Sequence, residues 1–229
     1  IVPGVDSAGH TNIASEGAIR VWVKSYWTSA SLTDGKGPGA DAVLAELVVV
    51  DNKQAAIVWS LQVNQDGSVL SLIGPSKAGP VELLKAEIGW QAGEWHLITL
   101  DYGKATALFI DGRLVAEGAG TLSVPPKDSG LIAGSTFAGT QTLEGEIDEL
   151  YCFGAALTEE DVSFYYNGLS QQSQLGPVSA AEEQAEAEAE AKWQAEQEAS
   201  SKVDGPQMRM LVGGTSECIT NVPVYITNL

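Results

Sequence analysis

The sequence lacks the short motifs that mark several common classes of enzyme. It has no Gly-x-Ser-x-Gly, phosphate-loop or dinucleotide-binding motif. The two histidines, His10 and His96, lie far apart and have no serine or cysteine motif beside them. These absences argue against a catalytic triad and against a nucleotide-dependent enzyme.

Cysteine is also scarce, since the chain has only Cys152 and Cys218. Without a Cys-x-x-Cys pair or a Cys/His cluster, a structural zinc site is not expected. The two cysteines either form a disulfide that links the main domain to the C-terminal segment, or remain as two buried thiols. The sequence leaves both alternatives open, because a disulfide needs Cα atoms within about 7 Å of each other.

Basic residues are few, with 12 Lys and Arg against 30 Asp and Glu, so the net charge is −18. Such a surface repels phosphate backbones, which argues against nucleic acids and anionic membranes as partners. The acidic groups confer solubility or attract Ca²⁺. No apolar run of membrane-spanning length and no signal peptide is present, and the chain begins at Ile1. Any export signal would therefore already have been removed.

What the sequence does contain is a series of short alternating segments separated by turn signals. In the first, Ile19, Val21 and Val23 alternate with polar residues and Trp22, as in a half-buried strand. Asp111-Gly112 is the strongest hairpin signal. Strands are expected at 17–27, 43–50, 55–63, 68–73, 81–88, 95–102, 105–110, 114–116, 131–133 and 146–153, after an irregular lead-in at 1–10. Many short strands without helices between them predict an all-β, two-sheet antiparallel sandwich.

The C-terminal part has a different composition. The stretch 157–162 predicts a helix start with Thr158 as N-cap, and residues 180–199 are nearly all Ala, Glu and Gln. The predicted organisation is a sandwich at 1–176, a Glu/Ala-rich α-helix or spacer at 177–203 and a β-rich tail at 204–229. The tail is too short for a core of its own, so we expect it to dock on the sandwich or on another subunit.

Four stretches resemble, in order, the motifs of laminin-G-like domains. They are Gly17–Val23, Gly93–Leu100, Ala107–Val115 and Leu143–Tyr151, and Ala156–Val162 follows as a fifth. The resemblance covers about residues 15–170. It implies a jelly-roll sandwich of the concanavalin-A-like type, and extracellular binding of carbohydrate or protein. Fold membership does not choose between these ligands.

Two carboxylates, Glu146 and Asp148, are expected on one face of a strand. The related laminarinase-like glycosidases use Glu-x-Asp-x-x-Glu or a one-residue-shorter form, but the third acid would fall at Leu150 or Tyr151 and is missing. We therefore expect no enzyme. In the resembled family an aspartate like Asp148 helps to hold structural Ca²⁺ or caps backbone N–H groups, and both alternatives stay open.

Trp22 and Trp27 are the candidate ligand-binding residues, because sugars stack on aromatic rings. The alternative is that both belong to the core. We expect a non-enzymatic extracellular binding or adhesion module that recognises glycan or protein. The alternatives are a structural subunit of an extracellular filament or sheath, which would exchange strands through residues 204–229, and, less favoured, a glycoside hydrolase.

Overall fold

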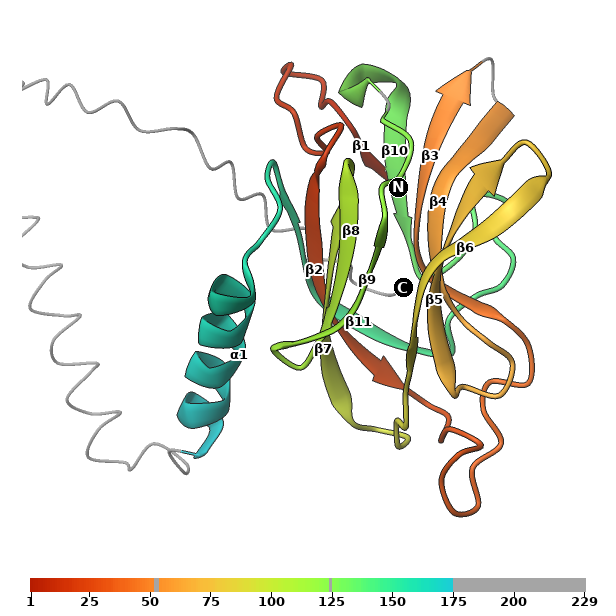
Figure 1. Cartoon of the computed structure of the whole chain (residues 1–229), viewed down its shortest axis with the longest axis vertical. Coiled ribbons are helices and arrows are strands. Elements are labelled where there is room, and N and C mark those ends of the chain that lie inside the picture. The colour runs from red at the N-terminus through yellow and green to blue at the C-terminus, as the bar shows by residue number, and fades with distance from the viewer. Residues whose placement is uncertain (52–53, 124, 175–229) are drawn as a thin grey trace, which may run out of the picture. The chain divides into compact units, whose positions relative to one another are not determined.

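A computed structural model describes residues 1–51, 54–123 and 125–174, which form a β-sandwich followed by one helix (Figure 1). The elements are β1 (Val2–Pro3), β2 (Gly17–Ser25), β3 (Ala42–Asp51), β4 (Gln54–Val63), β5 (Val69–Ser76), β6 (Gly79–Glu87), β7 (Trp95–Tyr102), β8 (Ala105–Ile110), β9 (Arg113–Ala119), η1 (Pro126–Asp128), β10 (Ser129–Ala133), β11 (Gly145–Phe153) and α1 (Glu159–Gln174). The six-stranded sheet has the order β1-β10-β3-β4-β5-β6, and the five-stranded sheet has the order β11-β2-β7-β8-β9. All strand pairs within the two sheets are antiparallel, which confirms the predicted fold class.

The chain divides into two compact units. The first contains residues 1–167, which include the whole sandwich and the first half of α1, and the second begins at Gly168. Every site described below lies within residues 1–167.

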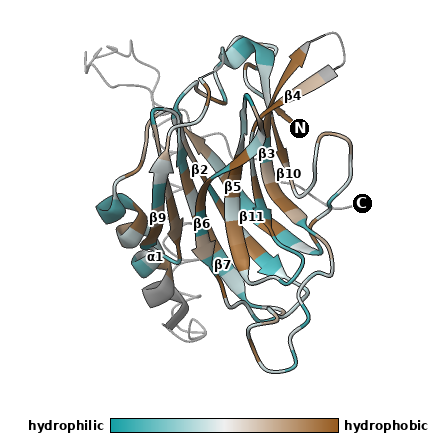
Figure 2. Ribbon diagram, turned by 45° about the vertical axis from the view of Figure 1, so that its right-hand side comes forward, coloured by the Kyte–Doolittle hydropathy of each residue, from teal (hydrophilic) through white to brown (hydrophobic). Residues whose placement is uncertain are grey.

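The main core lies between the two sheets, whose strands carry many hydrophobic residues (brown in Figure 2). In β2 the inward residues Ile19, Val21 and Val23 are at most 3% exposed, whereas Trp22 and Lys24 on the other face are half-buried. Trp59 of the six-stranded sheet is fully buried, and its ring centroid lies 5.5 Å from that of Tyr102. The alternation predicted for this strand is therefore confirmed.

A second apolar layer lies on the outer face of the five-stranded sheet. Leu97, Thr99 and Phe109 point away from the main core and are nevertheless at most 3% exposed. Val162 of α1 is also buried, and α1 runs beside this sheet in Figure 1. The first half of α1 therefore covers the middle of this outer face.

The helix begins where the sequence predicts. The Thr158 hydroxyl accepts a hydrogen bond from the Asp161 N–H at 3.1 Å, and the Asp161 carboxylate accepts one from the Thr158 N–H at 3.1 Å. This is a capping box in which Asp takes the place of Glu or Gln. Each side chain satisfies a backbone donor that the first turn leaves free.

All the predicted strands are present, with ends that shift by at most three residues, and there are two further differences. The lead-in at 1–10 contains the short strand β1, in which Val2 pairs with Leu131 of β10. In β11 the two residues Glu149 and Leu150 lie opposite the single residue Val21, which makes a β-bulge. Alternation alone does not reveal a bulge, because it inserts one residue into an otherwise regular pattern.

Several predictions concern residues outside those described. They are the helix or spacer at 177–203, the tail at 204–229 and the cysteine at position 218. In the described part of the chain, no helix is long and apolar enough to cross a membrane.

Substitution of a core leucine tests the placement of the main core. Leu61 is fully buried, so Leu61→Ala is expected to lower the free energy of unfolding by about 2–4 kcal/mol through lost burial and a cavity. Leu122 is 56% exposed and serves as the matched control, with an expected change within about 0.5 kcal/mol for Leu122→Ala. Urea unfolding measures both, and equal losses would contradict the assigned core.

Candidate functional site

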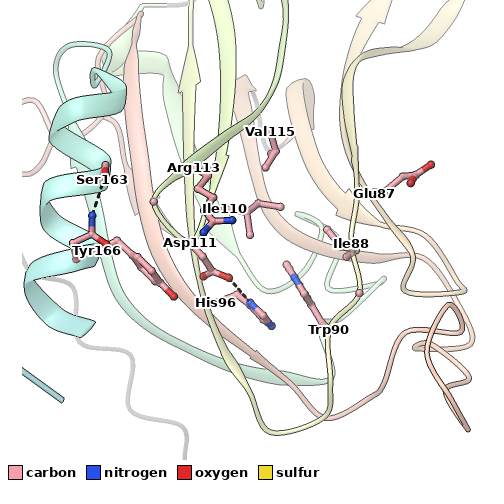
Figure 3. Close-up of a pocket in the computed structure, with 13 residues that line it drawn as sticks. Glu87, Ile88, Trp90, His96, Ile110, Asp111, Arg113, Val115, Ser163 and Tyr166 are labelled. Atoms are coloured by element: carbon pink, nitrogen blue, oxygen red, sulfur yellow. Dashed lines mark hydrogen bonds and ion pairs between the residues drawn. The ribbon is translucent and has the colours of Figure 1, made fainter. Parts of the chain in front are cut away.

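A pocket of about 620 Å³ opens where the end of β6, the β8–β9 hairpin and the first half of α1 meet (Figure 3). Its lining combines aromatic, charged and amide side chains. The lining residues are Glu87, Ile88, Gly89, Trp90, His96, Ile110, Asp111, Gly112, Arg113, Val115, Ser163, Tyr166 and Asn167. A concave surface with a few convergent polar groups is typical of a ligand site.

Asp111 anchors the hairpin side of the pocket. It occupies the first turn position with φ 52°, and Gly112 follows with φ 79°, as a type I′ turn requires. Its carboxylate accepts hydrogen bonds from the Leu97 N–H at 2.8 Å and pairs with His96 Nδ1 at 2.8 Å. Both carboxylate oxygens are therefore engaged, which fixes the turn against β7.

A stack of three rings supports the same wall. The His96 ring stacks on Trp90 with centroids 4.8 Å apart, and Trp90 stacks on Trp27 with centroids 5.8 Å apart. Trp90 is only 2% exposed, so it is a rigid backing for His96 rather than an open platform. The buried His96 Nε2 has no hydrogen-bond partner among the described residues.

The opposite wall comes from α1. A side chain at Gly112 would place its Cβ 2.9 Å from the Cβ of Tyr166, so glycine is needed for the close approach of hairpin and helix. The Tyr166 ring centroid lies 6.1 Å from that of Trp22. Asn167 donates a hydrogen bond to Ser163 Oγ at 3.1 Å, which orients its amide on the helix.

Arg20 holds α1 in this position. Its guanidinium carbon lies 3.3 Å from the ring centroid of Tyr165 and 5.2 Å from those of Tyr151 and Phe153. Burial lowers the pKa of Arg20. The Tyr165 hydroxyl donates a hydrogen bond to Glu149 at 2.7 Å, and burial followed by this bond raises the pKa of Tyr165 to about 12. The enclosed cation and the neutral phenol thus join the helix to β2 and β11.

A profile of the concanavalin A-like lectin/glucanases superfamily matches residues 21–163. The chain belongs to this superfamily. The matched region contains both sheets except β1 and the beginning of β2, together with the start of α1. It therefore also contains most of the residues that line the pocket.

Solved structures with a similar fold come from several organisms. A heptameric SAP-like pentraxin from Limulus polyphemus is 15% identical, with 66% of this chain and 69% of that chain covered and a TM-score of 0.43. Domain 4 of an extracellular arabinanase from Geobacillus stearothermophilus, in complex with arabinotriose, is 17% identical, with 66% of each chain covered and a TM-score of 0.46. The CBM40 domain of the Ruminococcus gnavus IT-sialidase, bound to α2,3-sialyllactose, is 12% identical, with 68% of this chain and 84% of that chain covered and a TM-score of 0.46. No protein with a curated description matches the chain.

The two predicted ligand-binding tryptophans of this lectin-like domain lie in different surroundings. Trp22 lies on the outer face of the five-stranded sheet, as the alternation predicts, but Tyr166 of α1 packs beside it. Trp27 is 6% exposed and belongs to the main core, so little of its ring can meet a ligand. Neither tryptophan lines the pocket, although both contact residues that do.

The predicted metal ligand Asp148 is exposed and its carboxylate accepts the Glu149 N–H at 2.8 Å. The described residues contain no group of three or more His, Cys, Asp or Glu that could hold a metal ion. Because Ca²⁺ takes 6–8 oxygen ligands, these residues do not fit a carboxylate-rich calcium site, and calcium binding at Asp148 stays a prediction. The contact with the Glu149 N–H matches the capping role that was the alternative for Asp148.

Cys152 is half-buried, and burial raises the pKa of its thiol to about 11. Its predicted disulfide partner, Cys218, lies outside the described residues, so the disulfide stays a prediction.

Arg113, Tyr166 and Asn167 line the pocket but are not among the site residues predicted from the sequence. Arg113 follows the Asp111-Gly112 turn, and its position at the tip of a hairpin was a usable signal. The two residues of α1 carried no such signal, because their place in the pocket depends on how the helix packs.

Asp101 is a second notable polar group, on the outer face of the five-stranded sheet. It is only 6% exposed, and its Oδ1 accepts the Leu157 N–H at 3.1 Å. Burial raises the pKa of Asp101 from 3.8 to about 6, against the lowering effect of this hydrogen bond. The folded protein therefore holds the Asp101 proton more tightly than the unfolded chain does.

Removal of the Tyr165 ring, which packs on the Arg20 guanidinium, tests how α1 is held. Tyr165→Ala is expected to lower the free energy of unfolding by about 1–3 kcal/mol and to speed amide hydrogen exchange in residues 159–167. Phe164 is 81% exposed, so Phe164→Ala is the matched control and should leave both unchanged. Equal effects of the two substitutions would show that Tyr165 does not anchor the helix.

The pKa of Asp101 predicts a pH dependence with a definite sign. Because the folded pKa is raised, this group stabilises the fold below about pH 4 relative to neutral pH, and the contribution is lost as the pH rises to about 6. Asp101→Asn keeps an acceptor for the Leu157 N–H. It should be more stable than the parent by about 1–2 kcal/mol at pH 7 and equal to it near pH 4. Urea unfolding at both pH values measures this difference, and a pH-independent difference would contradict the burial of a titrating Asp101.

Proposed function

We propose that this domain is a non-enzymatic module that binds a glycan in the pocket between the Asp111-Gly112 turn and α1. The observation that carries the proposal is the lining of this pocket. A tyrosine ring and several hydrogen-bonding side chains face a cavity of about 620 Å³. Membership of a lectin and glucanase superfamily agrees with a sugar ligand but does not locate it.

The lining has the chemistry that a sugar requires. Sugar hydroxyls are donors and acceptors at once, and Arg113, Asn167 and Glu87 offer a guanidinium, an amide and a carboxylate. The apolar C–H face of the ring can pack on the half-buried ring of Tyr166. Arg113 is exposed and forms no ion pair with any residue in the described ranges, so its donors are available to a ligand.

The carboxylates support binding rather than hydrolysis. A glycosidase needs two acidic groups across the scissile bond, one of them with a raised pKa. In the pocket, Asp111 is engaged by His96 and Leu97, which leaves Glu87. In the other candidate pair, Glu146 and Asp148, hydrogen bonds from Lys24 and then Tyr26 lower the pKa of Glu146, so Glu146 does not have the raised pKa that the general acid requires. The proposal includes an extracellular or cell-surface location, where glycans are displayed.

A glycan array followed by calorimetry with the best binder tests this function on the full chain. We expect Arg113→Ala and Asn167→Ala each to weaken binding by about tenfold, which corresponds to the loss of about 1.4 kcal/mol of hydrogen bonding. Lys77→Ala removes an exposed cation from the β5–β6 turn, away from the pocket, and should leave affinity unchanged.

Two results would contradict the proposal. One is the absence of binding to any glycan on the array. The other is a bound glycan whose affinity responds neither to Arg113→Ala nor to Asn167→Ala, which would place the site elsewhere on the domain.

A further inference from the structure

A second pocket, of about 380 Å³, lies at the end of the five-stranded sheet near the loop that precedes α1. Small residues line much of it, among them Gly17, Ala105, Ala107 and Ala155. Because their side chains are short, the backbone leaves room for a small ligand. This pocket shares no residue with the first one.

The buried carboxylate of Asp101 is part of this lining. One of its oxygens accepts the Leu157 N–H, and none of the described residues bonds the other. The free oxygen is not among the fully buried polar atoms that lack a partner, so it reaches the surface of the pocket. The residue as a whole is only 6% exposed, and the loss of most of its water makes the charged form costly. The raised pKa of Asp101 reports this cost. Such a group in a cavity is a candidate ligand acceptor.

The charges around Asp101 favour a cation as the ligand. Glu16 and Glu117 add two carboxylates to the lining, and the one cation there, Lys104, pairs with Glu16 at 3.1 Å on the exposed rim. Arg20 lies on the same face of the sheet but is enclosed by the rings of Tyr151, Phe153 and Tyr165. No cation within the described residues therefore neutralises Asp101.

A metal ion is not the cation that fits. Among the described residues, no group of three acidic side chains could hold a metal ion. A single buried carboxylate with small apolar neighbours instead suits a monovalent cation with few donors. We propose that this pocket binds a primary ammonium group carried on a short aliphatic chain, with the free oxygen of Asp101 as its main acceptor. The ammonium supplies the missing donor, and the alanine and glycine residues contact the alkyl part.

A titration with n-butylammonium chloride, followed by amide chemical shifts of the full chain, tests this inference. The neutral isostere n-butanol and sodium chloride at equal ionic strength are the ligand controls. At about pH 7 we expect saturable shifts in residues 101–107 and 154–157 with n-butylammonium alone. At about pH 5 the affinity should fall by about tenfold, because most of Asp101 is then protonated.

Two variants separate the contribution of Asp101 to the affinity from that of the other acidic side chains of the pocket. Asp101→Asn keeps the size and the bond to Leu157 and should reduce the affinity by about tenfold or more, whereas Glu117→Gln should change it by less than about threefold. Equal shifts with n-butanol, no saturable shifts with n-butylammonium, or unchanged affinity in Asp101→Asn would overturn the inference. The result is independent of the glycan proposal, which concerns other residues.

Discussion

The enclosure of the Arg20 guanidinium by the rings of Tyr151, Phe153 and Tyr165 is the interaction on which the outer face of the five-stranded sheet depends. A cation in this place has lost part of its water, and three aromatic faces partly replace it. Two of the rings belong to β11 and the third to α1, so the arrangement is complete only when the helix lies on the sheet. Without the helix, the partly buried charge would lose its closest ring, that of Tyr165.

The position of the helix gives the outer face three zones along the paired strands β2 and β7, namely a covered middle and two ends. In the middle, α1 covers the rows that pair Trp22 with Leu97 and Arg20 with Thr99. At one end, Trp95 is 39% exposed beside the ion pair of Lys24 and Glu146.

At the other end of this face, the row that contains Asp101 meets the loop before the helix. The docked helix also supplies Ser163, Tyr166 and Asn167 to the pocket that we propose as the glycan site. Both proposed sites therefore lie next to the helix or to the loop before it, although they share no residues.

Much of the fold could be predicted from the sequence, because its causes are local. The alternation in β2 and the Asp111-Gly112 turn each depend on a few neighbouring residues, and Thr158 acts within one turn of helix. The bulge at Glu149 could not be predicted, since it replaces the expected alternation with an extra residue that only the partner strand reveals.

The candidate site was less predictable, because packing between distant elements decides it. The alternation puts Trp22 on the face opposite Ile19, Val21 and Val23, and the structure has it there, but nothing in the pattern indicates that Tyr166 lies beside it. Trp27 had the same residue type and a nearby position, and it lies in the core, stacked on Trp90. The choice between open and covered aromatic rings depends on contacts between residues that lie far apart in the sequence, as Trp22 and Tyr166 or Trp27 and Trp90 do.

The chemical shifts of the Arg20 side chain test the central claim, the docking of α1 through this cation, most directly. With the guanidinium 3.3 Å from the Tyr165 ring centroid, ring currents should move the Arg20 side-chain protons well upfield in the full chain. The same protons should return toward ordinary arginine values in Tyr165→Ala. Ordinary shifts in the unmodified protein would mean that α1 does not lie on the sheet as described.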